Sequence, residues 1–461
     1  MKSVRKRIAV IGGGIAGLAA AVRLRDLTPS GTEIVVFEGS PALGGKLHTG
    51  ELGGRRVERG AESFLASGSD GAESAAVAFA RRLGLGEALV HPAARPAALA
   101  IGGRLTPIPG GTLVGVPGDL SALDGVALPA SGADVDRGRP LLAPGADVAV
   151  GELVRERYGD EVVDRLVDPM LGGVYAGRAD RLSLRVTMPQ LAATAETEHT
   201  LAGAVRAAQA RSRRVPGRPV FAAVGDGMSR LVDAAASAAG ARVVLGLPVR
   251  ELSRTPAGRW KLIFGSAPSP GVDEVDAVVL AVPASPAARL LGDPAVGELA
   301  YASVALAAMA LPAGATLPDL SGFLVPPGEG TLVKAATFFT TKWPHLAREP
   351  GPVVVRVSLG RAGEEDRLQL DDASLLAVAR RELGELIGAE LPAPVDSWVQ
   401  RWGGGLPQYA PGHADRVARL RAGLPEGLAL AGAAFDGVGI PACVASGERA
   451  ADDVYRFLEG N

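Results

Sequence analysis

Short apolar runs predict buried β-strands near the start, the middle and the end of this chain. Runs in which almost every residue is apolar are typical of strands covered on both faces of a parallel sheet. They occupy residues 7–11, 33–38, 276–282 and 428–432. Because these runs lie far apart in the sequence, we expect one domain to be assembled from discontinuous segments.

Segments with helical periodicity of apolar residues separate these strands. The expected helices are 17–27, 72–85, 148–171, 182–211, 228–239, 374–387 and 446–458. Further strands are expected at 219–224, 242–250 and 260–264, and over most of 299–358. Residues 91–150, rich in Gly, Pro and Ala, predict loops and short strands. The mixture of strands and helices indicates the α/β class.

A glycine-rich turn between the first strand and the first helix carries the strongest local signal. It consists of Gly12, Gly13, Gly14, Ile15, Ala16 and Gly17. Such a turn lets the backbone approach a pyrophosphate, and the helix that follows directs N–H groups and its positive dipole end at the anion. Glu38 ends the second strand, where an acid can bind ribose hydroxyls. Turn, helix and acid together predict a dinucleotide-binding site.

A second glycine pair, Gly44 and Gly45, is followed by Lys46. Backbone N–H groups and an ammonium placed together can bind one pyrophosphate. The sequence Gly-Gly-Lys alone is a common loop, but its position shortly after Glu38 favours a role in the same nucleotide site.

Charge and cysteine content exclude several classes of function. The chain has 48 basic and 50 acidic residues, a net charge of −2, so we expect no nucleic-acid partner bound through global charge. Its single cysteine, Cys443, rules out an internal disulfide and any thiolate zinc or iron–sulfur site. The five histidines show no metal-ligand spacing, and no metal site is expected.

The N-terminal sequence has some features of a signal peptide, because basic residues precede the apolar stretch 8–22. We reject that interpretation because the stretch contains the glycine-rich turn, and cleavage would destroy the nucleotide-binding unit. No uninterrupted apolar segment is long enough to predict a spanning helix. A cytoplasmic location with at most peripheral membrane contact is therefore expected.

Eight segments carry a resemblance to a known family. They are GGGIAGL (12–18), FEGSPALGGK (37–46), ERGAESFLA (58–66), AVP (281–283), GAAFDGVGIP (432–441), DPMLGGVYAGRADRLSL (168–184), KWPHL (342–346) and RWGGGLPQYAPGH (401–413). The chain resembles the bacterial coproporphyrinogen III and protoporphyrinogen oxidases of the monoamine-oxidase-like FAD superfamily. The first two segments are shared by many flavoproteins, and the last five are more specific to these oxidases.

The resemblance implies FAD as the cofactor and assigns its contacts. Gly12, Gly13, Gly14, Ile15, Ala16 and Gly17 would hold the pyrophosphate, Glu38 and Gly39 the adenosine ribose, and Gly45 and Lys46 the phosphate and ribityl region. Gly60, Ala61, Glu62 and Ser63 would lie against the flavin, and the backbone of Val249 against the adenine. Trp402, Val438, Gly439 and Ile440 would cover the flavin end.

Substrate contacts are less well defined by the sequence. In some relatives a basic residue closely follows the SFL of the third segment, but residues 66–70 here offer none. Arg178 and Lys342, within two family segments, are the candidates for binding substrate propionates. No catalytic residue is assigned, because flavin oxidases of this type often need no protein base.

The resemblance also implies three structural parts. A discontinuous Rossmann-like FAD domain would combine residues 1–71, 215–289 and 428–461. A helical domain would span 72–214, and a mixed-sheet substrate domain would span 290–427.

The implied activity is the six-electron oxidation of coproporphyrinogen III to coproporphyrin III in haem biosynthesis. Hydride transfer from a meso carbon to flavin N5 and reoxidation by O₂, which releases hydrogen peroxide, would occur in three cycles. Other enzymes of the haem pathway are possible partners. Protoporphyrinogen IX remains an alternative substrate, and another FAD amine oxidase, a carotenoid-type desaturase or a non-catalytic flavoprotein are alternative classes.

Overall fold

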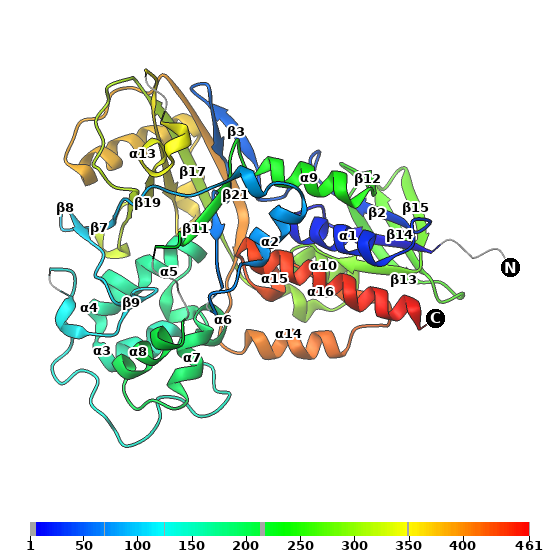
Figure 1. Ribbon diagram of the computed structural model, residues 1–461, viewed down its shortest axis with the longest axis horizontal. Coiled ribbons are helices and arrows are strands. Elements are labelled where there is room, and N and C mark those ends of the chain that lie inside the picture. The colour runs from blue at the N-terminus through cyan, green and yellow to red at the C-terminus, as the bar shows by residue number, and fades with distance from the viewer. Residues whose placement is uncertain (1–5, 69, 124, 213–216, 348–349, 461) are drawn as a thin grey trace.

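The computed structural model describes residues 6–68, 70–123, 125–212, 217–347 and 350–460. Figure 1 shows an elongated molecule with the two termini at one end. A five-stranded sheet and its helices form the half that contains the termini. A seven-stranded sheet and a group of helices form the other half.

The five-stranded sheet is parallel and contains strands from three distant parts of the chain. Its order is β12 (Arg242–Val244), β2 (Glu33–Phe37), β1 (Arg7–Ile11), β16 (Ala277–Leu280) and β22 (Leu428–Leu430). The inner strands β1 and β16 are almost wholly buried, which explains their continuous apolar sequences.

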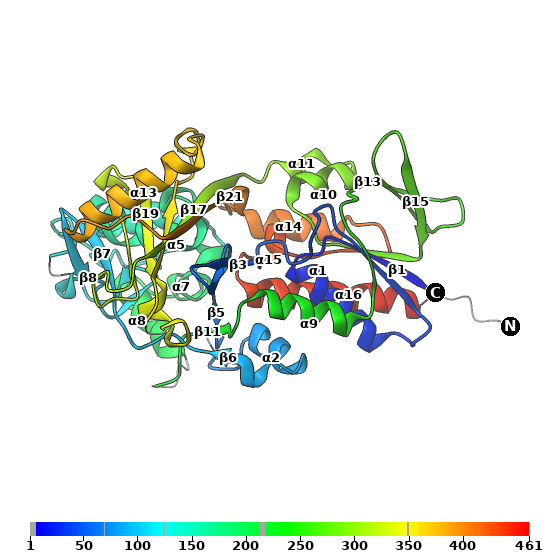
Figure 2. The same cartoon turned by 90° about the horizontal axis from the view of Figure 1, so that it is seen from above.

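Alternate residues of β1 contact two different layers. Ile8 and Val10 pack with helices α1 (Ile15–Leu27), α9 (Ser229–Ala239) and α16 (Ile440–Glu459). Ala9 and Ile11 pack with the antiparallel strands β13 (Val249–Arg254), β14 (Trp260–Gly265) and β15 (Pro270–Val275), and with α10 (Ala284–Leu291). Figure 2 shows α1, α9 and α16 together on one side and α10 on the other.

Helices α1 and α16 pack closely although they come from opposite ends of the chain. Gly447 of α16 permits this approach, since a β-carbon there would overlap the carbonyl oxygen of Ala16. Both helices begin near the middle of the molecule in Figure 1 and run toward its terminal end.

The seven-stranded sheet is mixed. Its order is β21 (Asp396–Pro407), β17 (Tyr301–Leu311), β20 (Val353–Leu359), β19 (Val333–Phe338), β18 (Gly322–Leu324), β7 (Ala97–Ile101) and β8 (Arg104–Pro107). Only the β18–β7 pair among these strands is parallel. One face packs on α13 (Asp372–Ile387), while Leu306, Ala308 and Ala310 on the other face of β17 join the core around α1 and α16.

The helical part consists of short helices with a core of their own. They are α3 (Val150–Tyr158), α4 (Asp160–Val162), a π-helical turn (Val163–Val167), α5 (Asp168–Tyr175), α6 (Leu184–Thr187), α7 (Pro189–Ala195) and α8 (Leu201–Arg211). Helix α5 contacts β18 and β19 and so joins this part to the seven-stranded sheet.

The α/β fold class is confirmed, and several expected elements differ in extent. The expected helix 148–171 is interrupted at Gly159, which adopts a φ of +93°. The expected strand 242–250 forms the separate strands β12 and β13. The last helix begins at Ile440, because Pro441 lies at its first turn, where proline is well tolerated.

The three-part division of the chain stays a prediction. The five-stranded sheet draws strands from each of the three segments expected to form the FAD domain. Strands β7 and β8 lie within residues 72–214, the range expected to form the helical domain, yet they extend the seven-stranded sheet. Within the described ranges, no helix combines the length and apolar composition needed to cross a bilayer.

We expect Gly447→Ala to lower stability by about 1–3 kcal/mol, because the new methyl group forces α16 away from α1. The measurement is the urea unfolding midpoint of the FAD-saturated protein. Gly328→Ala is the matched control, since a β-carbon there meets nothing within 4 Å. Equal midpoints for both variants would show that the packing of α1 on α16 tolerates a side chain.

Candidate FAD site and active site

The glycine-rich turn lies at the carboxyl edge of the five-stranded sheet, between β1 and α1. Gly17 packs against the turn so tightly that a β-carbon would overlap the carbonyl oxygen of Gly12. At Gly14, by contrast, a β-carbon would meet nothing within 4 Å. The turn is therefore held rigidly from behind and leaves an open space in front of Gly14, as a pyrophosphate site requires.

Two helices direct uncapped amino ends toward this region. Gly14 is the N-cap of α1 and Gly439 is the N-cap of α16, and neither N-cap has a side-chain hydrogen bond. Neither helix has an acidic residue in its first turn. Backbone N–H groups at such ends need acceptors, and an anionic cofactor can supply them.

Glu38 is oriented by the backbone on both sides of it. Its Oε2 accepts a hydrogen bond from the N–H of Gly13 at 2.7 Å, and its Oε1 accepts one from the N–H of Ser40 at 2.8 Å. Leu247 N–H donates to the carbonyl oxygen of Glu38 at 3.3 Å, which places the start of β13, and hence Val249, beside this strand end. The structure thus brings the expected ribose and adenine residues together at one edge.

The second glycine pair meets the first turn directly. Gly44 N–H donates to the carbonyl oxygen of Gly13 at 2.9 Å. Lys46, which follows this glycine pair, is exposed to solvent, yet desolvation by the surrounding protein lowers the pKa of its ammonium. The exposed ammonium of Lys46 is thus free to meet a bound cofactor.

The segment expected beside the flavin continues from Lys46. Ala61 N–H donates to the carbonyl oxygen of Lys46 at 3.1 Å, and the Trp402 indole N–H donates to the carbonyl oxygen of Arg59 at 2.7 Å. The side chain of Trp402 on β21 therefore covers the start of the segment 60–63. Figure 1 shows β21 passing between the two halves of the molecule.

Glu62 connects the same segment to the seven-stranded sheet. Its carboxylate pairs with Lys342, and with Arg356 of β20 at 2.6 Å. Arg356 also donates to the carbonyl oxygens of Glu58 at 2.8 Å and Gly60 at 2.9 Å. The two cations hold the pKa of Glu62 below its ordinary value although burial opposes them.

The two candidate propionate-binding residues occupy different environments. Lys342, at the end of α12 (Phe339–Lys342), is engaged by Glu62. Arg178 follows α5 and pairs with the buried Asp168 at 3.1 Å. Each already has a carboxylate partner, and their contact with substrate stays a prediction.

Sequence reasoning missed Arg356 and Lys334. Both are charged residues inside otherwise apolar strands, VVVRVSL and VKAATF. Burying a charge in such a strand costs free energy unless the charge has a partner. A charged residue within an apolar strand therefore indicates a candidate functional residue. Which face of the sheet carries each charge depends on the strand register, which the sequence does not show.

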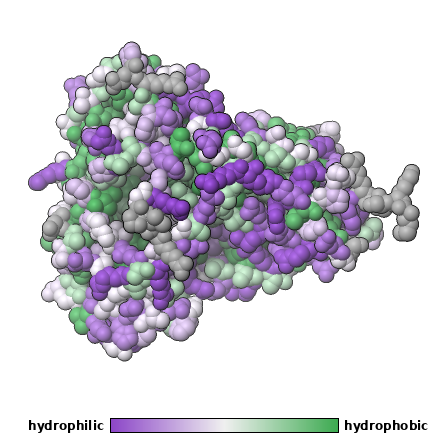
Figure 3. Space-filling view, viewed as in Figure 1, coloured by the Kyte–Doolittle hydropathy of each residue, from purple (hydrophilic) through white to green (hydrophobic). Residues whose placement is uncertain are grey.

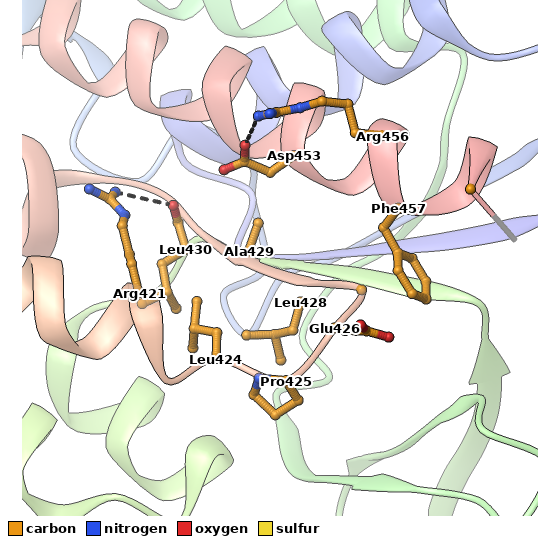
Figure 4. Close-up of a pocket in the computed structure, with 12 residues that line it drawn as sticks. Arg421, Leu424, Pro425, Glu426, Leu428, Ala429, Leu430, Asp453, Arg456 and Phe457 are labelled. Atoms are coloured by element: carbon orange, nitrogen blue, oxygen red, sulfur yellow. Dashed lines mark hydrogen bonds and ion pairs between the residues drawn. The ribbon is translucent and has the colours of Figure 1, made fainter.

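A cavity of about 530 Å³ lies elsewhere on the molecule. Figure 4 shows it between Arg421, Leu428 and Phe457, at the amino end of β22 and the last turns of α16. The glycine-rich turn lies at the opposite, carboxyl edge of the sheet, so this cavity is separate from the candidate site.

The fold and the edge-of-sheet site define a flavin-dependent oxidoreductase. A family model described as flavin containing amine oxidoreductase matches residues 15–455, and the chain belongs to this family. FAD is its cofactor, and the open space at Gly14, the two uncapped helices and the ordered Glu38 carboxylate fit that group.

Named relatives extend over almost the whole chain. A protein of Mycobacterium tuberculosis (strain ATCC 25618 / H37Rv) named coproporphyrinogen III oxidase is 37% identical over 98% of this chain and 97% of its own length. One of the same name from Bacillus subtilis (strain 168) is 30% identical, covering 99% of this chain and 100% of its own.

Solved structures give the same architecture. A crystal structure from Exiguobacterium sp. 255-15, named as a protoporphyrinogen oxidase, has a TM-score of 0.84 and 30% identity, covering 98% of this chain and 99% of that chain. Cyclohexylamine oxidase from Brevibacterium oxydans IH-35A has a TM-score of 0.69 at 16% identity, covering 99% and 100%, which shows the fold alone. The expected family resemblance is confirmed.

We expect Gly14→Val to abolish FAD binding while the protein stays folded. The backbone at Gly14 has a φ of −71°, which valine adopts readily, and the side chain would fill the open space. The measurements are bound flavin absorbance and the circular dichroism spectrum. Gly110→Val, also at an open position, is the control and should keep its FAD. Full FAD occupancy in Gly14→Val would refute the pyrophosphate assignment.

We expect Glu62→Gln to destabilise the protein by about 3–5 kcal/mol at pH 7, because Lys342 and Arg356 lose their shared counter-ion. The folded-state pKa of Glu62 is lowered, so its stabilisation is present above the ordinary glutamate pKa and is lost as pH falls through the folded value. Urea unfolding with saturating FAD at neutral and acid pH measures both effects.

The exposed pair Arg95–Asp319 supplies the control for this substitution. Asp319→Asn should change the unfolding free energy little, since exposed ion pairs contribute weakly. A loss in Glu62→Gln no larger than that in Asp319→Asn would contradict a structural role for the buried cluster.

Proposed function

We propose that this chain oxidises coproporphyrinogen III to coproporphyrin III in haem biosynthesis. The observation that supports this most strongly is 37% identity, over almost the full length of both chains, to the mycobacterial protein named coproporphyrinogen III oxidase. A location in the cytoplasm and transfer of product to other haem-pathway enzymes are part of the proposal.

The arrangement of the site suits such a reaction. FAD supplies a two-electron acceptor, so six electrons require three cycles, with O₂ as the final acceptor and hydrogen peroxide as the by-product. The residues of this chain orient the reactants. The Trp402 indole and the ion pairs of Glu62 with Lys342 and Arg356 hold the segment 60–63 in place. Arg356 reaches this segment from β20.

Protoporphyrinogen IX is the second candidate substrate. The Exiguobacterium structure carries that substrate in its name, and so does a chloroplastic Arabidopsis thaliana relative, 27% identical over 97% of this chain and 88% of its own. The higher identity to the mycobacterial protein favours coproporphyrinogen III. Amine oxidases share the fold at only 16–17% identity, which supports no substrate assignment.

Anaerobic mixing separates these candidates. We expect coproporphyrinogen III to bleach the flavin absorbance faster than protoporphyrinogen IX or any member of an amine panel. With oxygen admitted, about three molecules of O₂ should be consumed for each coproporphyrin III formed. Faster bleaching by protoporphyrinogen IX would contradict the assignment of coproporphyrinogen III as the substrate. Bleaching by an amine alone would contradict the assignment as a porphyrinogen oxidase.

A further inference from the structure

Lys334 is a buried cation with no acidic partner among the described residues. It lies on β19 with 7% of its surface exposed, and its Nζ donates to the carbonyl oxygen of Gly172 on α5 at 3.0 Å. That carbonyl already accepts the N–H of Ala176 at 2.9 Å. An ammonium has three donor hydrogens, so the recorded bond leaves Lys334 with capacity for a further acceptor.

The neighbouring cations are already paired. Glu62 pairs with Lys342 and Arg356, and Asp168 pairs with Arg178. Arg361 pairs with Glu364 at 4.0 Å, and its guanidinium also donates to the carbonyl oxygens of Thr331, Val325 and Val333. Among these five cations, Lys334 therefore stands out as the buried one that lacks a bound carboxylate.

The surroundings of Lys334 disfavour its charge in the absence of an anion. Burial, together with the positive charges of Arg361 and Arg356, lowers the pKa of Lys334 to about 7. The end of α5 offers partial compensation, since helix carboxyl ends favour cations. A carboxylate placed next to Lys334 would supply the full counter-charge that the protein does not.

The position of Lys334 connects it to the candidate active site. Ala176, the residue after α5, packs with Val304 and Trp402, and Trp402 covers the segment 60–63. Between Gly172 and Ala176, the side chain of Val174 is 49% exposed. At the end of the molecule away from the termini, Figure 3 shows a hollow in the surface between the part that contains α13 and the part that contains the short helices. Apolar residues surround this hollow.

We propose that Lys334 binds a carboxylate of the substrate, a propionate side chain of the porphyrinogen, and so favours substrates with more carboxylates. This inference rests on the proposed function. It assigns Lys334 a specificity role beside the two candidates Arg178 and Lys342, both of which have protein partners.

Equilibrium binding of the oxidised product to the FAD-loaded protein tests this inference without turnover. Coproporphyrin III carries four propionates, and its tetramethyl ester carries none. We expect Lys334→Met to raise the Kd for coproporphyrin III about tenfold, the loss typical of one charged hydrogen bond, and to leave the Kd for the ester unchanged. Lys334→Arg should retain most of the affinity, because it keeps the charge.

Stability measurements distinguish this role from a purely structural one. If Lys334 only ties β19 to α5, Lys334→Met should lower the melting temperature and leave both Kd values unchanged. If Lys334 instead binds a substrate carboxylate, Lys334→Met should melt no lower than the wild-type protein. Replacing an unpaired buried charge by an apolar side chain removes the free-energy cost of burying that charge. Lys261→Met, on the remote strand β14, is the matched control.

Two outcomes would overturn the inference in different ways. If the wild-type protein oxidises coproporphyrinogen III and Lys334→Met changes neither Kd, or changes both equally, the Lys334 inference fails and the proposed function stands. If the wild-type protein neither oxidises coproporphyrinogen III nor binds coproporphyrin III, the proposed function fails and the Lys334 inference fails with it.

Discussion

The uncapped amino ends of α1 and α16 are the constraint on which the rest of the structure depends. Backbone N–H groups at a helix start must find acceptors, and in neither helix does a side chain cap them. Gly447 lets α16 pack side by side with α1 at Ala16. The first and last thirds of the chain thus each contribute a helix with an uncapped start to the half of the molecule where we expect the cofactor.

The other half of the molecule is fixed to the nucleotide-binding half through buried charge. Glu62, on the segment beside the expected flavin position, binds Arg356 of the seven-stranded sheet and Lys342 of α12. Leu306 and Ala308 of the same sheet join the core of the nucleotide-binding half. The face that would receive the substrate is consequently held at a defined position relative to the cofactor.

Local sequence was sufficient where a pattern has one physical solution. The geometry of the turn Gly12–Gly17 and the position of Glu38 were predicted from the sequence, because a tight strand–turn–helix unit requires glycine in the turn and an acid at the end of the next strand is part of the same motif. Helix α16 begins at Ile440 instead of the expected residue 446, and Pro441 lies in its first turn, where proline is tolerated. The role of Lys334 was invisible, because it depends on the irregular register between Val333 and Ala335 and on a carbonyl from α5.

An experimental structure of the protein with FAD tests the central claim most directly. We expect the pyrophosphate against the backbone at Gly14, with the ribose at Glu38 and the isoalloxazine ring between the segment 60–63 and the start of α16 at Ile440. A structure in which the pyrophosphate lies away from Gly14, or in which the flavin lies outside the region between the two halves, would contradict the account.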